Sequence, residues 1–313
     1  MRIPDIAFFD TFIKYDRLKE KDIKKFTQQL ASGKKILTPS DNTVDTVRSL
    51  RLSNIADDLN VYRKNIDIVK STLEIAEDSL RSTVDAMQET RVEIIRLHNT
   101  GVLDYEDAQI VKDFLEGMRD YVIDMANVKV GDSYIFSGVR NQITPFDSAG
   151  NYSGAVEESK VFISKGVETS NNFSGKDYFG VNEITNKITV VEVIDQIISI
   201  IDSGDLSQIH NRTINLSIGG KSYGDVKLLE AFDIGLSELM KYQSKIGSDV
   251  NVIDNIYQQH LQIEVNVKNL QSKLEDADYA YAISELEKAK TSYQALLSSI
   301  AQNKDLSLLN FIS

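Results

Sequence analysis

A long heptad repeat between Leu52 and Leu97 constrains the fold of this chain more than any other feature. Apolar residues recur there at alternating steps of three and four, and neither Gly nor Pro interrupts them. Twelve of the fourteen repeat positions are apolar, and the other two are Thr83 and Thr90. The fourteen positions are Leu52, Ile55, Leu59, Tyr62, Ile66, Val69, Leu73, Ala76, Leu80, Thr83, Met87, Thr90, Ile94 and Leu97. This spacing predicts a long α-helix with one apolar stripe and polar flanks. Such a helix is stable only when partner helices cover its stripe, so the chain must supply them.

The first partner helix is predicted directly after this repeat. Asn99-Thr100-Gly101 is a helix stop signal, and Asp104 is a suitable N-cap for the next helix. Residues 111–128 again carry apolar side chains at steps of three and four. The short connection predicts an antiparallel neighbour of the first helix, ending near Gly131.

The second partner lies in the last third of the chain. From Asp225 to Tyr281 the three-four spacing returns, with an interruption expected at Gly247. The repeat then shifts, and a separate apolar stripe runs from Ala282 to Ile300. The shift predicts a break between two helices near the end of the chain.

The N-terminal segment shows a matching break. Residues 1–31 form an imperfect amphipathic pattern, and residues 31–42 contain several helix-ending and helix-starting signals. Gly33 suits a helix C-cap, Pro39 disfavours helix at the residue before it, and Ser40–Asn42 offer N-caps. We therefore expect a loop between two helices and a domain joint here.

The middle of the chain has a different composition. Gly, Ser, Asn and aromatic residues are frequent from residue 132 onward, and short β-prone runs occur at Tyr134–Phe136 and Val161–Ile163. Residues 188–203 are predicted to form a helix, and Thr213–Ile218 a strand. These patterns predict a β-rich insertion.

Together the patterns predict a mainly α protein with a β-rich insertion. Its architecture is an elongated antiparallel helical bundle that carries an outer α+β domain and has terminal helices that are flexible in the monomer. We expect terminal assembly helices at 1–35 and 283–313, a helical-bundle core domain at 36–131 and 225–282, and an inserted outer domain at 132–224.

Composition excludes several classes of protein. The formal net charge is −12, whereas a general nucleic-acid binder shows a basic face. The absence of Cys excludes disulfides and thiolate metal sites. No apolar run reaches 18 residues, so no transmembrane helix is predicted. The N-terminal segment does not resemble a cleaved secretory signal, because its apolar patch is short and interrupted.

The sequence offers no pattern that indicates catalysis. The three histidines, His98, His210 and His260, are far apart, and His260 lies on an apolar stripe, which favours a packed core residue over a ligand. Gly219–Ser222 lacks the upstream Gly of a phosphate-binding loop and is expected to be a hairpin turn. We expect no catalytic residue, no cofactor-binding residue and no metal ligand, and therefore not an enzyme.

Several segments resemble the bacterial flagellin superfamily. Leu30–Ile36 followed by Pro39–Asp41 is similar to its N-terminal signature, and Ser292–Ala295 with Leu306–Asn310 is similar to its closing segment. In the middle, Tyr134–Gly138 and Asn151–Gly154 resemble the superfamily's hook-associated branch more than filament flagellin.

The resemblance implies a flagellin-like core and a structural role in the bacterial flagellum. It implies a ring oligomer of the chain that joins hook to filament, in contact with a neighbouring hook-associated protein and with flagellin. It also implies export without a cleaved signal peptide to an extracellular position, after a cytoplasmic chaperone has bound the C-terminal region. No nucleic-acid or membrane partner is expected.

The two terminal stripes lie outside the predicted core bundle, so we expect them to bury against equivalent stripes of neighbouring copies. The predicted assembly residues are Phe8, Phe12, Phe26, Leu286, Tyr293, Leu296, Ile300 and Leu308.

Two alternatives stay open at this point. A filament flagellin would share the superfamily features but would polymerise extensively by itself. A non-flagellar coiled-coil scaffold would instead form a folded dimer through the Leu52–Leu97 repeat.

Overall fold

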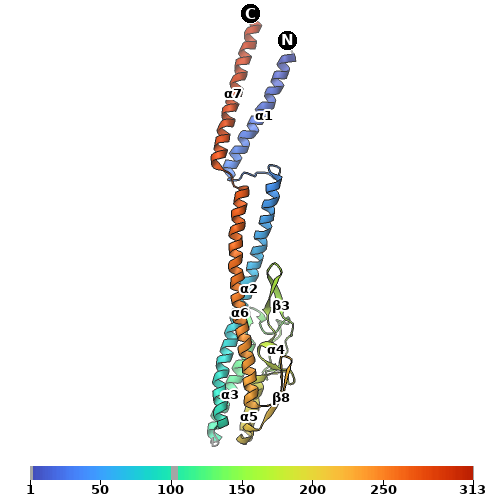
Figure 1. The fold of residues 1–313 in the computed structure, drawn as a ribbon, viewed down its shortest axis with the longest axis vertical. Coiled ribbons are helices and arrows are strands. Elements are labelled where there is room, and N and C mark those ends of the chain that lie inside the picture. The colour runs from blue at the N-terminus through green and yellow to red at the C-terminus, as the bar shows by residue number, and fades with distance from the viewer. Residues whose placement is uncertain (1–2, 100–104, 313) are drawn as a thin grey trace. The chain divides into compact units, whose positions relative to one another are not determined.

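A computed structural model describes residues 3–99 and 105–312 of the chain, with side chains described for residues 10–98 and 107–302 (Figure 1). The described contacts divide the chain into two compact units. Unit 1 comprises residues 1–58 and 262–313, and unit 2 comprises residues 59–261. The boundaries fall within two long helices, α2 (Thr43–Asn99) and α6 (Leu228–Glu275).

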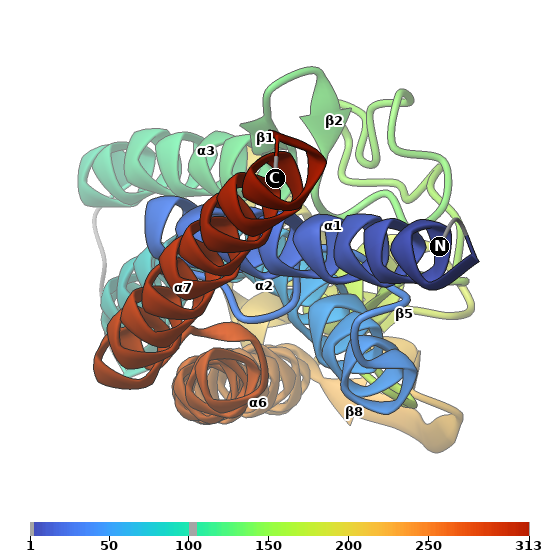
Figure 2. The same ribbon diagram turned by 90° about the horizontal axis from the view of Figure 1, so that it is seen from above.

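Unit 1 contains the two terminal helices, α1 (Ile3–Ser32) and α7 (Tyr279–Ile312), together with the start of α2 and the end of α6. Gly33 ends α1 with a left-handed φ of 70°, and its backbone N–H donates to the Gln29 carbonyl at 2.9 Å. Figure 1 shows α1 and α7 side by side, and Figure 2 shows that the two helices cross when seen from above.

The α2 helix begins where capping chemistry predicts it. The Asp45 backbone N–H donates to Asn42 Oδ1 at 3.1 Å, and Asn42 Nδ2 donates back to the Asp45 carboxylate at 2.6 Å. From Leu59 onward almost every repeat position is buried, whereas Ile55 is exposed, contrary to the predicted stripe. Thr83 and Thr90 are also buried on the stripe. Each hydroxyl donates to the backbone carbonyl four residues earlier, so neither hydroxyl is left unpaired by this burial.

In unit 2, α2 and α6 are antiparallel. Lys70 pairs with Asp254 at 2.6 Å, and Arg91 pairs with Asp233 at 2.6 Å. Residue numbers therefore rise along α2 in the direction in which they fall along α6. The helix α3 (Tyr105–Ala126) packs on α2, where Ser79 Oγ donates to the carbonyl of Met125 at 2.7 Å.

Two details of the predicted helices differ from the structure. The α6 helix continues through Gly247, because a glycine inside a helix lowers helix stability without ending the helix. The α3 helix ends at Ala126 instead of near Gly131, because the chain turns there into the first hairpin. Asp104, the predicted N-cap, lies outside the described residues.

The described strands form four two-stranded antiparallel hairpins. They are β1 (Lys129–Val130) with β2 (Ser133–Tyr134), β3 (Ser159–Ser164) with β4 (Val167–Asn172), β5 (Val181–Asn182) with β6 (Lys187–Ile188), and β7 (Thr213–Ile218) with β8 (Lys221–Lys227). The predicted strand Val161–Ile163 lies within β3, Thr213–Ile218 is confirmed as β7, and Gly219-Gly220 forms its turn. Of Tyr134–Phe136, only Tyr134 is in a strand.

Between the hairpins lie α4 (Gly175–Tyr178), α5 (Thr189–Ser203) and the 3₁₀ helix η1 (Leu206–His210). The α5 helix confirms the prediction for residues 188–203, and two thirds of its residues are buried, between Thr189 and Ile201. An aromatic cluster fills the space beneath the hairpins and consists of Phe136, Phe146, Phe173, Tyr178 and Phe179.

The predicted fold class, a mainly α chain with a β-rich insertion, is confirmed. The predicted division into three domains and the flexibility of the terminal helices in the monomer stay predictions.

Candidate assembly surface

The α1 and α7 helices pair along faces with few large buried side chains. Ala282 and Ala289 on α7 are buried, and their small side chains permit close approach of the two backbones. Half-buried positions recur on both helices at helical spacing. Six of the predicted assembly residues are among them: Phe12, Phe26, Leu286, Tyr293, Leu296 and Ile300.

Tyr293 shows that the two faces meet. The carboxylates of Asp16 and Glu20 on α1 lie beside its phenol, and desolvation together with these two negative charges raises the pKa of Tyr293. The predicted stripes therefore face each other within one chain. Their role between chains stays a prediction, and the side chains of Phe8 and Leu308 lie outside the described residues.

Other faces of the same helices carry exposed apolar side chains. Ile13 and Leu18 on α1 are each 45% exposed and line a hollow of about 420 Å³ whose rim carries Lys14, Arg17 and Lys21. The exposed set in unit 1 consists of Ile13, Tyr15, Leu18, Val44, Val47, Leu50, Ile55, Ile263, Val265, Leu270, Tyr279, Tyr281, Ile283 and Leu297. Ile55, Ile263, Leu270 and Tyr281 of this set lie on repeats that were expected to be buried against partner helices, and in this chain their side chains are exposed.

The segment after α1 and the break between α6 and α7 lie side by side and are joined by hydrogen bonds. The Lys35 backbone N–H donates to the Glu275 carbonyl at 2.7 Å, and the Ala277 N–H donates to the Gly33 carbonyl at 2.8 Å. Lys34 Nζ lies 2.7 Å from the Asp276 carboxylate and 3.2 Å from that of Glu275. We call residues 33–42 and 275–278 the joint.

Electrostatics favour the charged forms of these joint residues. The Ser49 hydroxyl donates to the Glu275 carboxylate, and this bond, with Lys34, lowers the pKa of Glu275. The hydrogen bond from Lys34 likewise lowers the pKa of Asp276, and the same contact raises the pKa of Lys34. The joint that the sequence predicted at residues 31–42 is therefore built from two segments about 240 residues apart.

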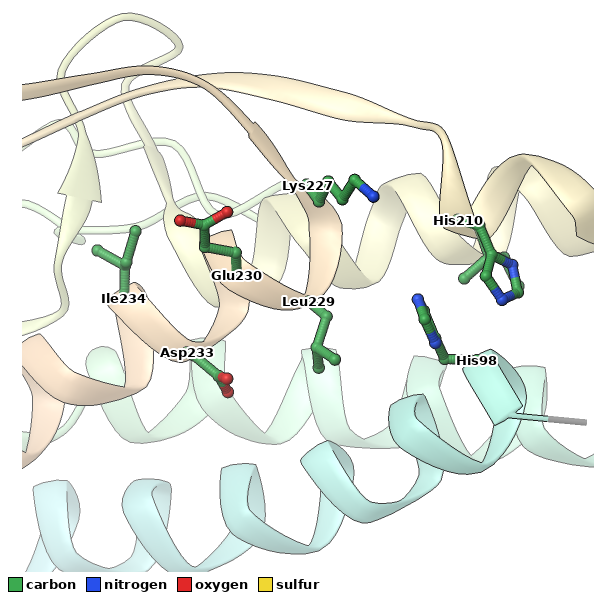
Figure 3. Close-up of a pocket in the computed structure, with 8 residues that line it drawn as sticks. His98, His210, Lys227, Leu229, Glu230, Asp233 and Ile234 are labelled. Carbon is green, nitrogen blue, oxygen red and sulfur yellow. The ribbon is translucent and has the colours of Figure 1, made fainter.

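In unit 2, the structure brings together two histidines that the sequence did not link. The rings of His98, at the end of α2, and His210, at the end of η1, lie with their centroids 4.0 Å apart (Figure 3). They line an open pocket of about 510 Å³ with Lys227, Glu230 and Asp233. Asp233 is held by two hydrogen bonds from the Arg91 guanidinium, at 2.6 and 3.0 Å.

Across the described residues, no group of three or more His, Asp or Glu side chains has the spacing to hold a metal ion. His260 is 2% exposed, which confirms that it is packed in the core. Within the part of the chain that the structure describes, no helix is long and apolar enough to cross a membrane.

Two family models match the chain at its two helical regions. The model for the bacterial flagellin N-terminal helical region matches residues 16–141, and that for the bacterial flagellin C-terminal helical region matches residues 229–312. Together they span more than half of the chain and leave out most of the hairpins.

Curated relatives point to one group of flagellar proteins. Flagellar hook-associated protein 3 of Escherichia coli (strain K12) is 26% identical over 138 residues, which cover 44% of this chain and 43% of the relative. Flagellar hook-associated protein 3 of Salmonella typhimurium is 28% identical over 132 residues, covering 42% and 41%. The aligned part is therefore less than half the length of these relatives.

Solved structures share the fold over a larger part of the chain. A flagellar hook-associated protein from Vibrio parahaemolyticus superposes with a TM-score of 0.61 at 20% identity, over 75% of this chain and 100% of that one. The flagellar junction protein FlgL from Legionella pneumophila gives a TM-score of 0.55 at 12% identity, over 72% and 100%. At these identities the likeness shows a shared fold.

Proposed function

Because the chain belongs to the bacterial flagellin family, we propose that it is a structural subunit that joins flagellar hook to filament by assembling with copies of itself. The family models support the assembly role, and the hook-associated names of the curated relatives favour a junction subunit over a filament flagellin. No observation favours the coiled-coil scaffold.

The observation that carries the proposal is the lack of a core in unit 1. Among its described side chains, only three apolar residues are buried, namely Val267, Ala282 and Ala289. Fourteen large apolar side chains of the same unit are exposed, against thirteen in the described part of unit 2, which has nearly twice as many residues. A surface of this kind is typical of proteins that bury it against partners.

The exposed apolar faces of unit 1 are the surfaces that we assign to contacts between copies. Ile13 and Leu18 serve on α1, and Ile283 and Leu297 serve on α7. Contacts made by the same set of faces on every copy, in a head-to-tail manner, close into a ring or continue as a helix.

The remaining parts of the proposal concern partners and location. The ring contacts a neighbouring hook-associated protein on one side and flagellin on the other. A cytoplasmic chaperone binds the C-terminal region before export, and the protein reaches its place in the extracellular flagellum without a cleaved signal peptide. The role is structural, without catalysis.

The proposal is tested by removing the terminal helices. A variant lacking residues 1–31 and 283–313 should keep the helical circular dichroism and cooperative unfolding of unit 2 but should no longer bind isolated hook ends, as followed by electron microscopy. The intact chain should stay soluble alone and assemble on hook ends. Loss of monomer folding in the truncated variant would contradict the assembly role, and extensive polymerisation of the intact chain alone would favour a filament flagellin.

A point variant with a matched control separates contact from folding. Leu18→Asp places a charge on the exposed face of α1, and Val92→Asp does the same on α2 in unit 2, where Val92 is 63% exposed. Hook-end binding should fall at least tenfold for Leu18→Asp and stay within about twofold for Val92→Asp, because burial of an unpaired charge is costly only at an interface.

A further inference from the structure

His260 is enclosed where the β3–β4 hairpin meets two long helices of unit 2. Its ring lies on α6 and is 2% exposed. Its Nε2 is 3.2 Å from the Ser164 hydroxyl at the end of β3, and its ring centroid is 5.9 Å from that of Tyr62 on α2. The imidazole therefore contacts all three elements.

Few other contacts hold this end of the hairpin. Ile163 is buried in the apolar core, Val161 packs against that core, and Asn65 Nδ2 on α2 donates to the Phe162 carbonyl at 2.8 Å. In the described sheets β3 pairs only with β4, so no third strand anchors it. The contact with His260 is therefore one of the described contacts that hold the hairpin tip.

The surroundings of His260 suit the neutral ring and not the protonated one. Its Nδ1 is buried and has no hydrogen-bond partner among the described residues. A protonated imidazole has two N–H donors and a positive charge, and both need partners when buried. Tyr62 and Arg63 from α2 and Ser164 from β3 lie near the ring, Arg63 carries a positive charge, and the next carboxylate along α6 is that of Glu264, one turn further on. Burial, and then the charge of Arg63, lower the pKa of His260.

We propose that His260 is an acid-sensitive latch that holds the tip of the β3–β4 hairpin on α2 and α6 when neutral and releases it when protonated. This device is independent of the proposed function. Because the ring is protonated more easily when it is released, the closed form is fully favoured above the ordinary histidine pKa of about 6.5. As the pH falls below that value toward the lower pKa of the closed form, the opening constant rises by up to about tenfold per pH unit.

Hydrogen–deuterium exchange tests the latch in the intact protein. Exchange of peptides from residues 159–172 is measured at pH 7.0 and 5.5, with the β7–β8 hairpin as internal reference for the intrinsic effect of pH. We expect the ratio of β3–β4 to β7–β8 exchange to rise at least about threefold at pH 5.5. In His260→Gln, whose side chain is uncharged at both pH values, the ratio should be the same at the two pH values.

A second variant and a direct titration complete the test. Ser164→Ala should raise β3–β4 exchange at pH 7.0 but keep its acid response, because the buried ring remains. The Hε1 signal of His260, assigned by its loss in His260→Gln, should titrate below 6.5. An unchanged ratio in the wild-type protein, an equal acid response in His260→Gln, or titration of His260 at 6.5 or above would each overturn the proposal.

Discussion

Glycine residues in this chain have opposite roles that depend on backbone geometry. Gly33 ends α1 with φ 70°, a left-handed conformation, and a Cβ there would lie 3.0 Å from the Tyr279 hydroxyl. Gly117 lies inside α3, and a Cβ there would have no atom within 4 Å. The same substitution is therefore expected to have effects of opposite sign at the two positions.

Gly33→Ala should weaken protection of the neighbouring joint amides by roughly 1–2 kcal/mol, the cost of the left-handed conformation for an L residue. Gly117→Ala should stabilise unit 2 by about 0.5–1 kcal/mol, because alanine is the better helix former. Native-state hydrogen exchange measures both. Changes of the same sign in both variants would show that the assigned backbone conformations are wrong.

Single residues also mark where prediction from the sequence ended. Gly33 and Asn42 could be assigned to caps because capping depends on neighbours within a few residues. The approach of His98 to His210 could not be predicted, because it depends on how α2 and η1 pack and leaves no local pattern. The contact of His260 with Ser164 was missed for the same reason.

At the scale of elements, periodicity identified the helices because a buried stripe repeats every few residues along one helix. The repeat did not predict that α6 continues as one helix through Gly247, where packing against the rest of the bundle outweighs the low helix propensity of glycine. Apart from the hairpin turn predicted at Gly219–Ser222, it also did not identify which strands pair, since the hairpins are short and their turns differ in length. The break near residue 276 was visible as a shift of the repeat, but its contact with Lys34 was not.

The joint is expected to loosen in acid. The pKa values of Glu275, Asp276 and Asp41 are lowered in the folded chain, so their contribution to stability is present above the ordinary carboxyl pKa of about 4 and is lost as the pH falls through the lower folded values. Exchange of the Lys35 and Thr38 amides, compared with that of unit 2, should therefore be unchanged between pH 7 and 5 and faster below pH 4.

Glu275→Gln is the matched test of this prediction, because the amide keeps the shape of the side chain but removes its charge and its ion pair with Lys34. The variant should show faster joint exchange already at pH 5 and a smaller change below pH 4. An acid response identical to that of the intact chain would show that Glu275 does not hold the joint.

At the scale of the whole molecule, the two units differ in how they are stabilised. Unit 2 has a continuous apolar core that runs from Ile66 on α2 to Ile253 on α6. Unit 1 also consists of long helices, but within the described residues it buries almost no large apolar side chain. We therefore propose that unit 1 completes its burial only against other subunits.

Limited proteolysis of the purified chain, with mass spectrometry of the fragments and light scattering of the intact protein, tests this claim most directly. We predict a monomer in which cleavage begins in α1 and α7, while a fragment containing residues 59–261 persists, because segments with few buried contacts open most easily. Terminal helices that resist cleavage in a stable dimer would contradict the claim, since they would already have their partners.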